Sequence, residues 1–194
     1  MPYAPEHKQR TRSRIVEAAS RLFKAHGYEG VGIDRIMAEA GLTRGGFYAH
    51  FKGKEALFAE VVEWLGPSTE MRKRFFAEKG ASGDSVLAFI RTYLSHAHRN
   101  DLAEGCPLAT LSVDISRAGP AARRGYTQAL RNAATRFAHY FSRRDVETED
   151  LAYGLLATCV GGMVLARAVE DEDTADAILK ACRKAATQLV EVNR

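Results

Sequence analysis

The sequence of 194 residues predicts an all-α protein, with an N-terminal three-helix helix-turn-helix head followed by a helical body, about nine helices in all. Two observations predict this fold class. Apolar residues recur at helical spacing along the chain, and no segment shows the alternation that marks a strand. In addition, Gly41 and Thr43 are a helix stop and a helix start two positions apart, which is typical of the steep turn in a helix-turn-helix.

The head is expected in residues 1–55. A first helix over residues 11–26 carries an apolar stripe and ends at Gly27, because glycine adopts the left-handed conformation at a helix end with little strain. A second helix over residues 33–40 follows, with Gly32 as a weak N-cap. These two helices form the support on which a third can lie.

The third helix, over residues 43–51, is expected to be the exposed tip of the head, with the Thr43 hydroxyl as its N-cap. Phe47 and Phe51 are four residues apart and share the face that turns toward the core of the head. The opposite face carries small residues and hydrogen-bond donors. A short helix with such a face can enter the major groove of DNA.

The body is expected in residues 56–194. Its expected helices cover, in order, residues 54–65 with a kink or break at Gly66-Pro67 and a continuation to residue 78, then residues 84–98, 106–117, 120–143, 148–169 and 174–192. The most apolar stretch, residues 151–169, is interrupted by polar side chains and glycines. We therefore expect it to be a buried helix and not a membrane span.

The formal charge of +4 lies entirely in the head. Residues 1–55 hold ten Lys or Arg and six Asp or Glu, whereas residues 56–194 hold eighteen of each sign. A basic head on a neutral body is the charge pattern of a phosphate-binding module joined to an uncharged domain. An ordinary basic tail gives the same count, so charge alone leaves both interpretations open.

The cysteines and the N-terminus indicate a cytoplasmic protein. Cys106, Cys159 and Cys182 are far apart in the sequence and form no CxxC pair, which suits a reducing compartment and predicts neither a disulfide framework nor a zinc site. The N-terminus carries basic residues in place of the apolar region of a secretion signal. We expect no cofactor, no metal and no membrane partner.

A long ordered pattern, LFKAHGYEGVGIDRIMAEAGLTRGGFYAHFKGKEALF, occupies the segment that begins at Leu22. Its informative features are Phe23, Gly27-Tyr28, Ile33, Ile36, Ala40-Gly41-Leu42-Thr43, Gly45, Phe47-Tyr48, His50-Phe51 and Lys54-Glu55-Ala56-Leu57. This pattern resembles the DNA-binding signature of the TetR family (TetR/AcrR type) of bacterial one-component transcriptional regulators. Farther along, GCPLATL (residues 105–111) is similar to a segment of one subgroup of these regulators.

The resemblance implies a set of DNA-contacting residues by position, namely Arg10, Arg12, Gly32, Thr43, Arg44, Gly45, Gly46, Tyr48, His50 and Lys54. Arg44 would reach a guanine or a phosphate, and the backbone at the two adjacent glycines could approach the bases. Thr43, Tyr48, His50 and Lys54 would bind phosphates, and Arg10 and Arg12 would hold the flanking strand. Two positions depart from the family pattern. The family often has Ser or Thr at Gly32 and Ser, Thr or Ala at Gly46. Three of these residues have an alternative to a DNA contact. Tyr48 can lie at the edge of the core, His50 can be partly buried, and Lys54 can be an ordinary solvated lysine.

The resemblance also implies a homodimer on double-stranded operator DNA, because one short recognition helix buries too little surface for tight binding. Two half-sites would lie about one DNA turn apart, roughly 34–36 Å. The dimer surface is expected on the last two helices, from one stripe on each. These stripes are Leu151, Leu155, Cys159, Gly162 and Ala166 on the first, and Ile178, Ala181, Cys182, Ala185 and Leu189 on the second.

The body, by the same resemblance, would bind an unidentified small-molecule effector. The candidate lining residues are Phe76, Phe89, Tyr93, Cys106, Leu111, Tyr126, Phe137, Tyr140 and Met163, and each of them can equally be plain core. Cys106 sits at an expected helix start, where the helix dipole stabilises a thiolate. An electrophile- or oxidant-sensing thiol regulator is therefore the alternative to a ligand-responsive repressor. Asp114 is expected to face water.

Two other classes of protein remain as alternatives. The sequence has no GxSxG, HExxH, GxGxxG or phosphate-cradling loop, so we expect no enzyme. A nucleoid-type protein that binds DNA without sequence preference is the second alternative. Repression is expected over activation, because members of the TetR family mostly occupy promoters and block polymerase.

Overall fold

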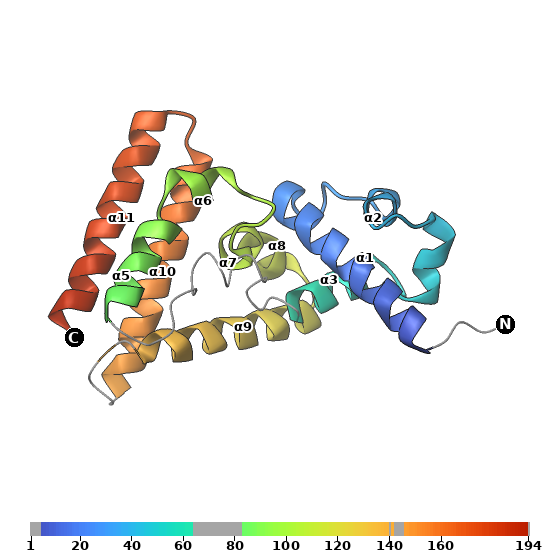
Figure 1. Ribbon diagram of the computed structural model, residues 1–194, viewed down its shortest axis with the longest axis horizontal. Helices are drawn as coiled ribbons and strands as arrows, with labels where there is room; N and C mark the ends of the chain where they lie inside the picture. Colours follow the sequence, from blue (N-terminus) through green and yellow to red (C-terminus); the bar gives the residue numbers. More distant parts are fainter. Residues whose placement is uncertain (1–4, 64–82, 140, 142–145, 194) are drawn as a thin grey trace.

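A computed structural model describes residues 5–63, 83–139, 141 and 146–193 of the chain. Within these ranges the protein consists of helices and has no strands, which agrees with the predicted all-α class. The head lies at one end of an elongated molecule and the two last helices at the other (Figure 1). Eleven helical segments occur among the described residues, against about nine expected.

The head and the first helix of the body comprise four helical segments in chain order, α1 (Pro5–His26), α2 (Ile33–Glu39), η1 (Arg44–Ala49) and α3 (Lys54–Glu63). The predicted stops are confirmed, because Gly27 and Gly41 have φ angles of 72° and 65°, in the region that favours glycine. Gly32 is the N-cap of α2, as expected. The first helix begins earlier than predicted, at Pro5 and not near residue 11.

The tip of the head differs from the expected α-helix over residues 43–51. It is a 3-10 helix, η1, of six residues, and Thr43 is its N-cap without a side-chain capping bond. The predicted hydroxyl cap is therefore wrong. Gly45 and Gly46 explain the shorter element, because two glycines in succession weaken an α-helix by about 1 kcal/mol each relative to alanine.

The body consists of α5 (Gly83–Tyr93), α6 (His96–Asn100), α7 (Pro107–Thr110), α8 (Ser112–Arg117), α9 (Pro120–Ala138), α10 (Val146–Ala168) and α11 (Glu172–Val192). Two predicted helices are each divided in two, which accounts for the higher number of segments. The helix predicted over residues 84–98 is divided into α5 and α6. Ser95, between them, caps α6 by accepting a hydrogen bond from the His98 N–H at 3.3 Å. Leu111 separates α7 from α8. The expected kink at Gly66-Pro67 lies outside the described residues.

The apolar residues form two clusters that meet at the junction of head and body. The body cluster centres on α10, which packs against α9 and α11. The head cluster takes in the buried face of α3, and α8 and α9 add Leu111, Ile115 and Ala122 to it. The expected boundary between residues 55 and 56 therefore falls at the start of a helix that packs on both sides.

A polar contact joins the same two parts. An Asp114 carboxylate oxygen on α8 accepts a hydrogen bond from the Tyr28 backbone N–H at 3.1 Å, just after the end of α1. The expectation that Asp114 faces water is wrong. The carboxylate instead satisfies a backbone donor that the end of α1 leaves unpaired, and it links the body to the first helix of the head.

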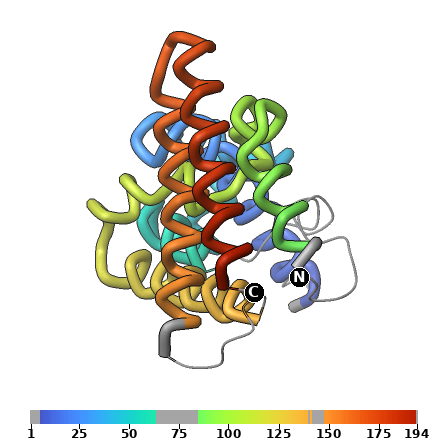
Figure 2. Tube along the Cα trace, turned by 90° about the vertical axis from the view of Figure 1, so that its left-hand side faces the viewer, coloured from blue at the N-terminus to red at the C-terminus, as the bar shows by residue number. Residues whose placement is uncertain are grey.

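Helix α10 is the one segment of the described chain that is long and apolar enough to cross a membrane, with a mean hydropathy of 1.5 over its most apolar part. Core helices meet the same criteria. Helix α10 packs against α11, which lies beside it in Figure 2, and against α9, and it supplies Leu155, Cys159 and Met163 to the buried cluster. These contacts favour the predicted buried helix over a membrane span.

Gly162 provides a test of the packing between α10 and α11. A Cβ atom added there would lie 2.6 Å from Sγ and 2.9 Å from Cβ of Cys182. We expect Gly162→Ala to lower the free energy of unfolding by about 1–3 kcal/mol, because the two helices must move apart. Urea unfolding followed by circular dichroism measures this change.

The control is Gly154→Ala on the same helix, where the added methyl group would lie at an ordinary contact distance of 3.7 Å from Leu189. It should raise the free energy of unfolding by up to about 1 kcal/mol, because alanine favours helices. Equal stability of the Gly162→Ala and wild-type proteins would contradict the close approach of the helices.

Candidate nucleic-acid interface

The exposed surface of η1 is the centre of the candidate interface. Phe47 and Phe51 are buried in the head cluster, with ring centroids 5.6 Å apart, and they fix η1 on α1 and α2. Thr43 and Arg44 lie at its exposed start. Tyr48, at 61% exposure, is the most exposed aromatic side chain of the described head and contacts Phe47 edge to face. The anchored and exposed faces are those that the sequence predicts.

The two glycines of η1 leave an open surface. A Cβ atom at Gly45 would meet nothing within 4 Å, and one at Gly46 would meet only Met37, at an ordinary distance of 3.7 Å. Neither residue has a positive φ. Neither conformation nor packing inside the described chain therefore requires glycine here. The open backbone can approach another molecule closely.

Arg44 lies at the start of η1 and pairs with α2. Its Nη1 atom donates to Asp34 Oδ2 at 2.8 Å, and both side chains are about two-thirds exposed, at 66% and 65%. The guanidinium is thus held at the surface of the tip and not folded into the core.

Arg12 has a role inside the head. Its guanidinium makes a two-pronged ion pair with Glu60 of α3, in which Nε lies 2.9 Å from Oε1. It also donates to the backbone oxygen of His50 and lies 4.2 Å from the centroid of the Phe51 ring. One side chain therefore joins α1, α3 and the end of η1. This role differs from the phosphate contact that the resemblance implies.

The remaining predicted contacts surround the tip. Arg10 is exposed on α1, and Gly32 is exposed at the start of α2. The Lys54 ammonium lies 4.2 Å from the centroid of the Tyr28 ring, so it is a cation–π partner as well as a surface charge. His50 is partly buried, with its Nδ1 atom buried and unpaired among the described residues. Burial, followed by the nearby Lys8 and Arg12, lowers the pKa of His50.

Three residues that the sequence analysis missed organise this surface. Asp34 holds Arg44, and Glu60 holds Arg12. Arg14 donates to the backbone oxygen of Ala40 at 2.6 Å and so ties α1 to the end of α2. No local pattern in the sequence connects these partners, because 10 to 48 positions separate them.

The predicted dimer stripe on α10 lies mostly inside the protomer. Leu155, Cys159, Gly162 and Ala166 are buried within the protomer, and Gly162 contacts Cys182 of α11 in the same chain. Leu151 is partly buried against the same cluster, as are Ile178, Cys182 and Leu189 of α11. The small residues thus bring α10 and α11 of one protomer together. Of the predicted set, Ala181 and Ala185 are exposed.

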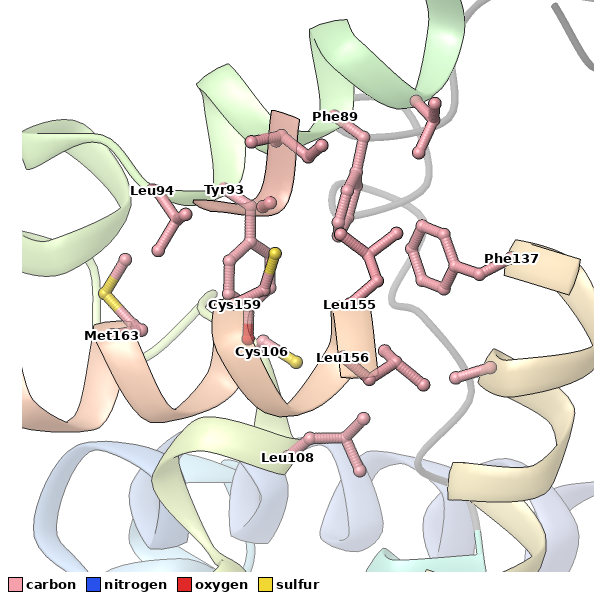
Figure 3. Packing of buried hydrophobic residues seen from close by; sticks show 14 of the residues in the cluster. Phe89, Tyr93, Leu94, Cys106, Leu108, Phe137, Leu155, Leu156, Cys159 and Met163 are labelled. Atoms are coloured by element: carbon pink, nitrogen blue, oxygen red, sulfur yellow. The ribbon is translucent and has the colours of Figure 1, made fainter. Parts of the chain in front are cut away.

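Most of the candidate effector-binding residues lie in the body cluster. Phe89, Tyr93, Cys106, Phe137 and Met163 are buried there, and Tyr93 points toward Cys106 and Cys159 (Figure 3). Leu111 belongs to the head cluster, and Tyr126 contacts both clusters. Phe76 and Tyr140 lie outside the described residues. The set therefore divides between the core and the junction.

The loop before Cys106 is closely packed. His98 accepts a bond from the Cys106 N–H at 3.1 Å, and Arg167 donates to the His98 backbone oxygen at 2.6 Å. A Cβ atom at Gly105 would lie 2.5 Å from the Asp101 backbone oxygen and 3.0 Å from Arg167. Only glycine fits this position without movement of the loop.

The surroundings of Cys106 do not favour the thiolate that the alternative thiol sensor requires. Burial raises the pKa of Cys106, and a hydrogen bond with the Tyr93 side chain opposes this only in part. Burial also raises the pKa of Cys159 to about 12 and that of the half-buried Cys182. Helix α7 has only four residues, so desolvation outweighs its dipole. The described residues contain no group of three or more His, Cys, Asp or Glu arranged to hold a metal ion.

Two family models match the chain. Residues 15–61 match the one described as "Bacterial regulatory proteins, tetR family". Residues 83–181, just over half of the chain, match the one described as "Transcriptional regulator LmrA/YxaF-like, C-terminal domain". The chain belongs to the TetR family. This membership confirms the resemblance found in the sequence and the prediction of a regulator and not an enzyme.

Relatives in the TetR family match the chain over part of their length. The uncharacterized HTH-type transcriptional regulator YfiR of Bacillus subtilis (strain 168) is 35% identical over 100 residues, which cover 52% of this chain and 44% of YfiR. The HTH-type transcriptional regulator LmrA of the same organism is 30% identical over 115 residues, which cover 55% of this chain and 57% of LmrA. The chain spans about half the length of these curated relatives.

Solved structures of TetR-family proteins share the fold. A TetR transcriptional regulator from Chloroflexus aurantiacus J-10-FL has a TM-score of 0.71 and 28% identity, over 94% of this chain and 97% of that chain. A TetR-family regulator from Cytophaga hutchinsonii has a TM-score of 0.76 and 18% identity, over 99% and 98% of the two chains. These similarities confirm the predicted all-α architecture.

The three cysteines allow a direct test of the thiol environment. We expect iodoacetamide at pH 7.5 to modify Cys182 first, because it is the only one of the three that is not fully buried. Cys106 and Cys159 should react only after unfolding, because buried thiols with a raised pKa form little thiolate. Peptide mass spectrometry of native and urea-treated samples measures the order. Modification of Cys106 before Cys182 in the native protein would contradict it.

Proposed function

We propose that this TetR-family protein is a ligand-responsive transcriptional repressor that binds a palindromic operator as a dimer and is released by a small-molecule effector. The observation that carries the proposal is the tip of the head. There an anchored Phe47 supports an exposed Arg44 and Tyr48 beside glycines that no internal contact requires. A rigid base with an open, donor-bearing edge suits insertion into the major groove.

The proposed DNA-contacting residues are the predicted set without Arg12, namely Arg10, Gly32, Thr43, Arg44, Gly45, Gly46, Tyr48, His50 and Lys54. Arg12 is left out because Glu60 and the His50 backbone occupy its guanidinium. Arg44 and the glycine backbone would specify bases, while the other residues position the head on phosphates. The excess charge of the head supports this division of roles.

The proposed dimer uses the outer face of α10 and α11, which lie side by side (Figure 2). Leu165 is 57% exposed and Val164 is 37% exposed on α10. Small residues flank them, namely Ala157, Gly161 and Ala168 on α10 and Ala177, Ala181 and Ala185 on α11. An exposed apolar face on an otherwise buried helix suits a second copy of the chain, which would place two heads on two half-sites.

The proposed effector site lies in the body, whose aromatic residues Phe89, Tyr93 and Phe137 pack at centroid distances of 4.7–5.2 Å. An effector that prefers one arrangement of these helices would shift the orientation of the heads through α8 and α9. Relatives named as repressors support repression, among them NemR of Escherichia coli (strain K12) and AcnR of Corynebacterium diphtheriae. We place the protein in the cytoplasm, where its DNA would lie.

Burial and a raised pKa at Cys106 favour this proposal over the alternative thiol sensor, because a neutral and enclosed thiol reacts slowly with electrophiles.

Arg44→Ala tests the DNA-binding proposal. The wild-type protein is first used to select duplexes from a library with a randomised 24-bp core. We expect Arg44→Ala to weaken binding to the selected duplex by about 1–3 kcal/mol and to relax the preference at one position in each half-site. Fluorescence anisotropy at fixed salt measures the affinity.

The control is Arg117→Ala, which removes the same charge from an exposed position of α8 in the body. It should leave the affinity within about twofold of the wild-type value. The field of an exposed charge in the body is screened within about 10 Å at about 0.1 M salt. Selection of no sequence by the wild-type protein would refute specific recognition, and equal losses for both variants would refute the role of Arg44.

Leu165→Asp tests the proposed dimer face. A charge buried in an apolar interface without a partner costs several kcal/mol, so we expect a monomer at micromolar concentration. Val113→Asp is the control, because Val113 on α8 is equally exposed, at 58%. Size-exclusion chromatography with light scattering gives the mass. A wild-type monomer, or a dimeric Leu165→Asp protein, would contradict the proposed face.

A further inference from the structure

The contact between Arg44 and Asp34 joins the two helices of the helix-turn-helix at their exposed starts. Arg44 is the first residue of η1, and Asp34 lies in the first turn of α2. Within the part of the chain that the structure describes, Nη1 is the only atom of the Arg44 guanidinium with a hydrogen bond to protein, through its 2.8 Å contact with Asp34. The Nη2 and Nε edge of the same group carries no such bond.

This pair adds little to the stability of the head, because ion pairs between exposed side chains are weak in water. Its effect lies in geometry. Arg44 precedes Gly45 and Gly46, so no side chain of the next two residues restrains it. Among the described residues the Asp34 carboxylate is the only group that fixes its direction. The negative charge of a carboxylate in the first turn of a helix is stabilised by the helix dipole.

We propose that Asp34 is a positioning residue that determines the base preference of Arg44. By binding Nη1, Asp34 leaves the Nη2 and Nε edge free to donate two hydrogen bonds to O6 and N7 of a guanine. The inference rests on the proposed function, because it requires that Arg44 reaches a base. The pair strengthens as the two groups enter the groove, where water is displaced and the local dielectric constant falls.

The opposite role for the same contact is competition, in which Asp34 keeps Arg44 away from DNA and only lowers affinity. The two roles make different predictions for a protein without the carboxylate. Competition predicts tighter binding to every sequence with unchanged preferences. Positioning predicts that the preference for one base pair is lost, whatever happens to the overall affinity.

The experiment compares Asp34→Asn with the matched control Glu39→Gln. Both residues are exposed carboxylates of α2 that pair with an arginine, and Glu39 pairs with Arg21 at 3.3 Å, on the side facing α1. Each variant removes one negative charge, so both change non-specific attraction to phosphates alike. The full-length proteins and Arg44→Ala select duplexes from the library with a randomised core, and sequencing gives the relative enrichment at each position.

We expect Asp34→Asn to reduce the preference at the position that Arg44→Ala relaxes by about tenfold, which is the range for one bidentate arginine–guanine contact. Asp34→Glu should restore part of the preference. Glu39→Gln should keep the wild-type profile. Thermal unfolding should show the same midpoint, within about 2 °C, for Asp34→Asn and Glu39→Gln, so that loss of folding does not explain the result.

An unchanged profile for Asp34→Asn, beside a relaxed profile for Arg44→Ala, would overturn the role of Asp34 and leave the proposed function intact. A relaxed profile for Glu39→Gln as well would also overturn it, because charge alone would then be responsible. An unchanged profile for Arg44→Ala would instead refute the base contact on which the inference rests.

Discussion

The structure depends on the apolar contact that α3 makes on both of its sides. Phe58 of α3 packs edge to face on Phe23 of α1, with centroids 5.3 Å apart. On its other side α3 packs against α9, whose Ala122 belongs to the same cluster. Such a layer is packed as densely as a crystal and transmits displacement instead of absorbing it. The head is therefore not a freely swinging module, and its orientation is set by the helices of the body. The proposed effector response would rest on this coupling.

Polar contacts also hold the helices of the head in place, in addition to the apolar layer around α3. Arg12, Arg14 and Asp114 each satisfy backbone groups or carboxylates that the ends of helices leave unpaired. All three contacts converge on the ends of α1, α2 and η1. As a consequence, the short 3-10 helix keeps its place although its own hydrogen bonds are few. The exposed side chains of the tip therefore extend from a backbone that these contacts hold in place.

The sequence predicts local features of this fold well and long-range partners poorly. The stops at Gly27 and Gly41 and the anchoring of Phe47 follow from residue type and spacing, and the structure confirms them. The shift from an α-helix to η1 was missed although Gly45 and Gly46 signal it. The sequence does not reveal which face of α10 is buried, because apolar residues occur on every side of that helix. Only the neighbouring helices decide which side is covered. Likewise, the raised pKa of Cys106 follows from burial by distant segments.

The tight loop before α7 changes the meaning of a short sequence motif. Gly105 is required because the Asp101 backbone and the Arg167 guanidinium leave no room for a side chain, and Pro107 starts the next helix. The first and third residues of the GCP motif are therefore explained by the packing of the loop and by the start of α7. Other chains that share them can be expected to share this corner of the fold. Grouping proteins by this motif would therefore sort them by architecture.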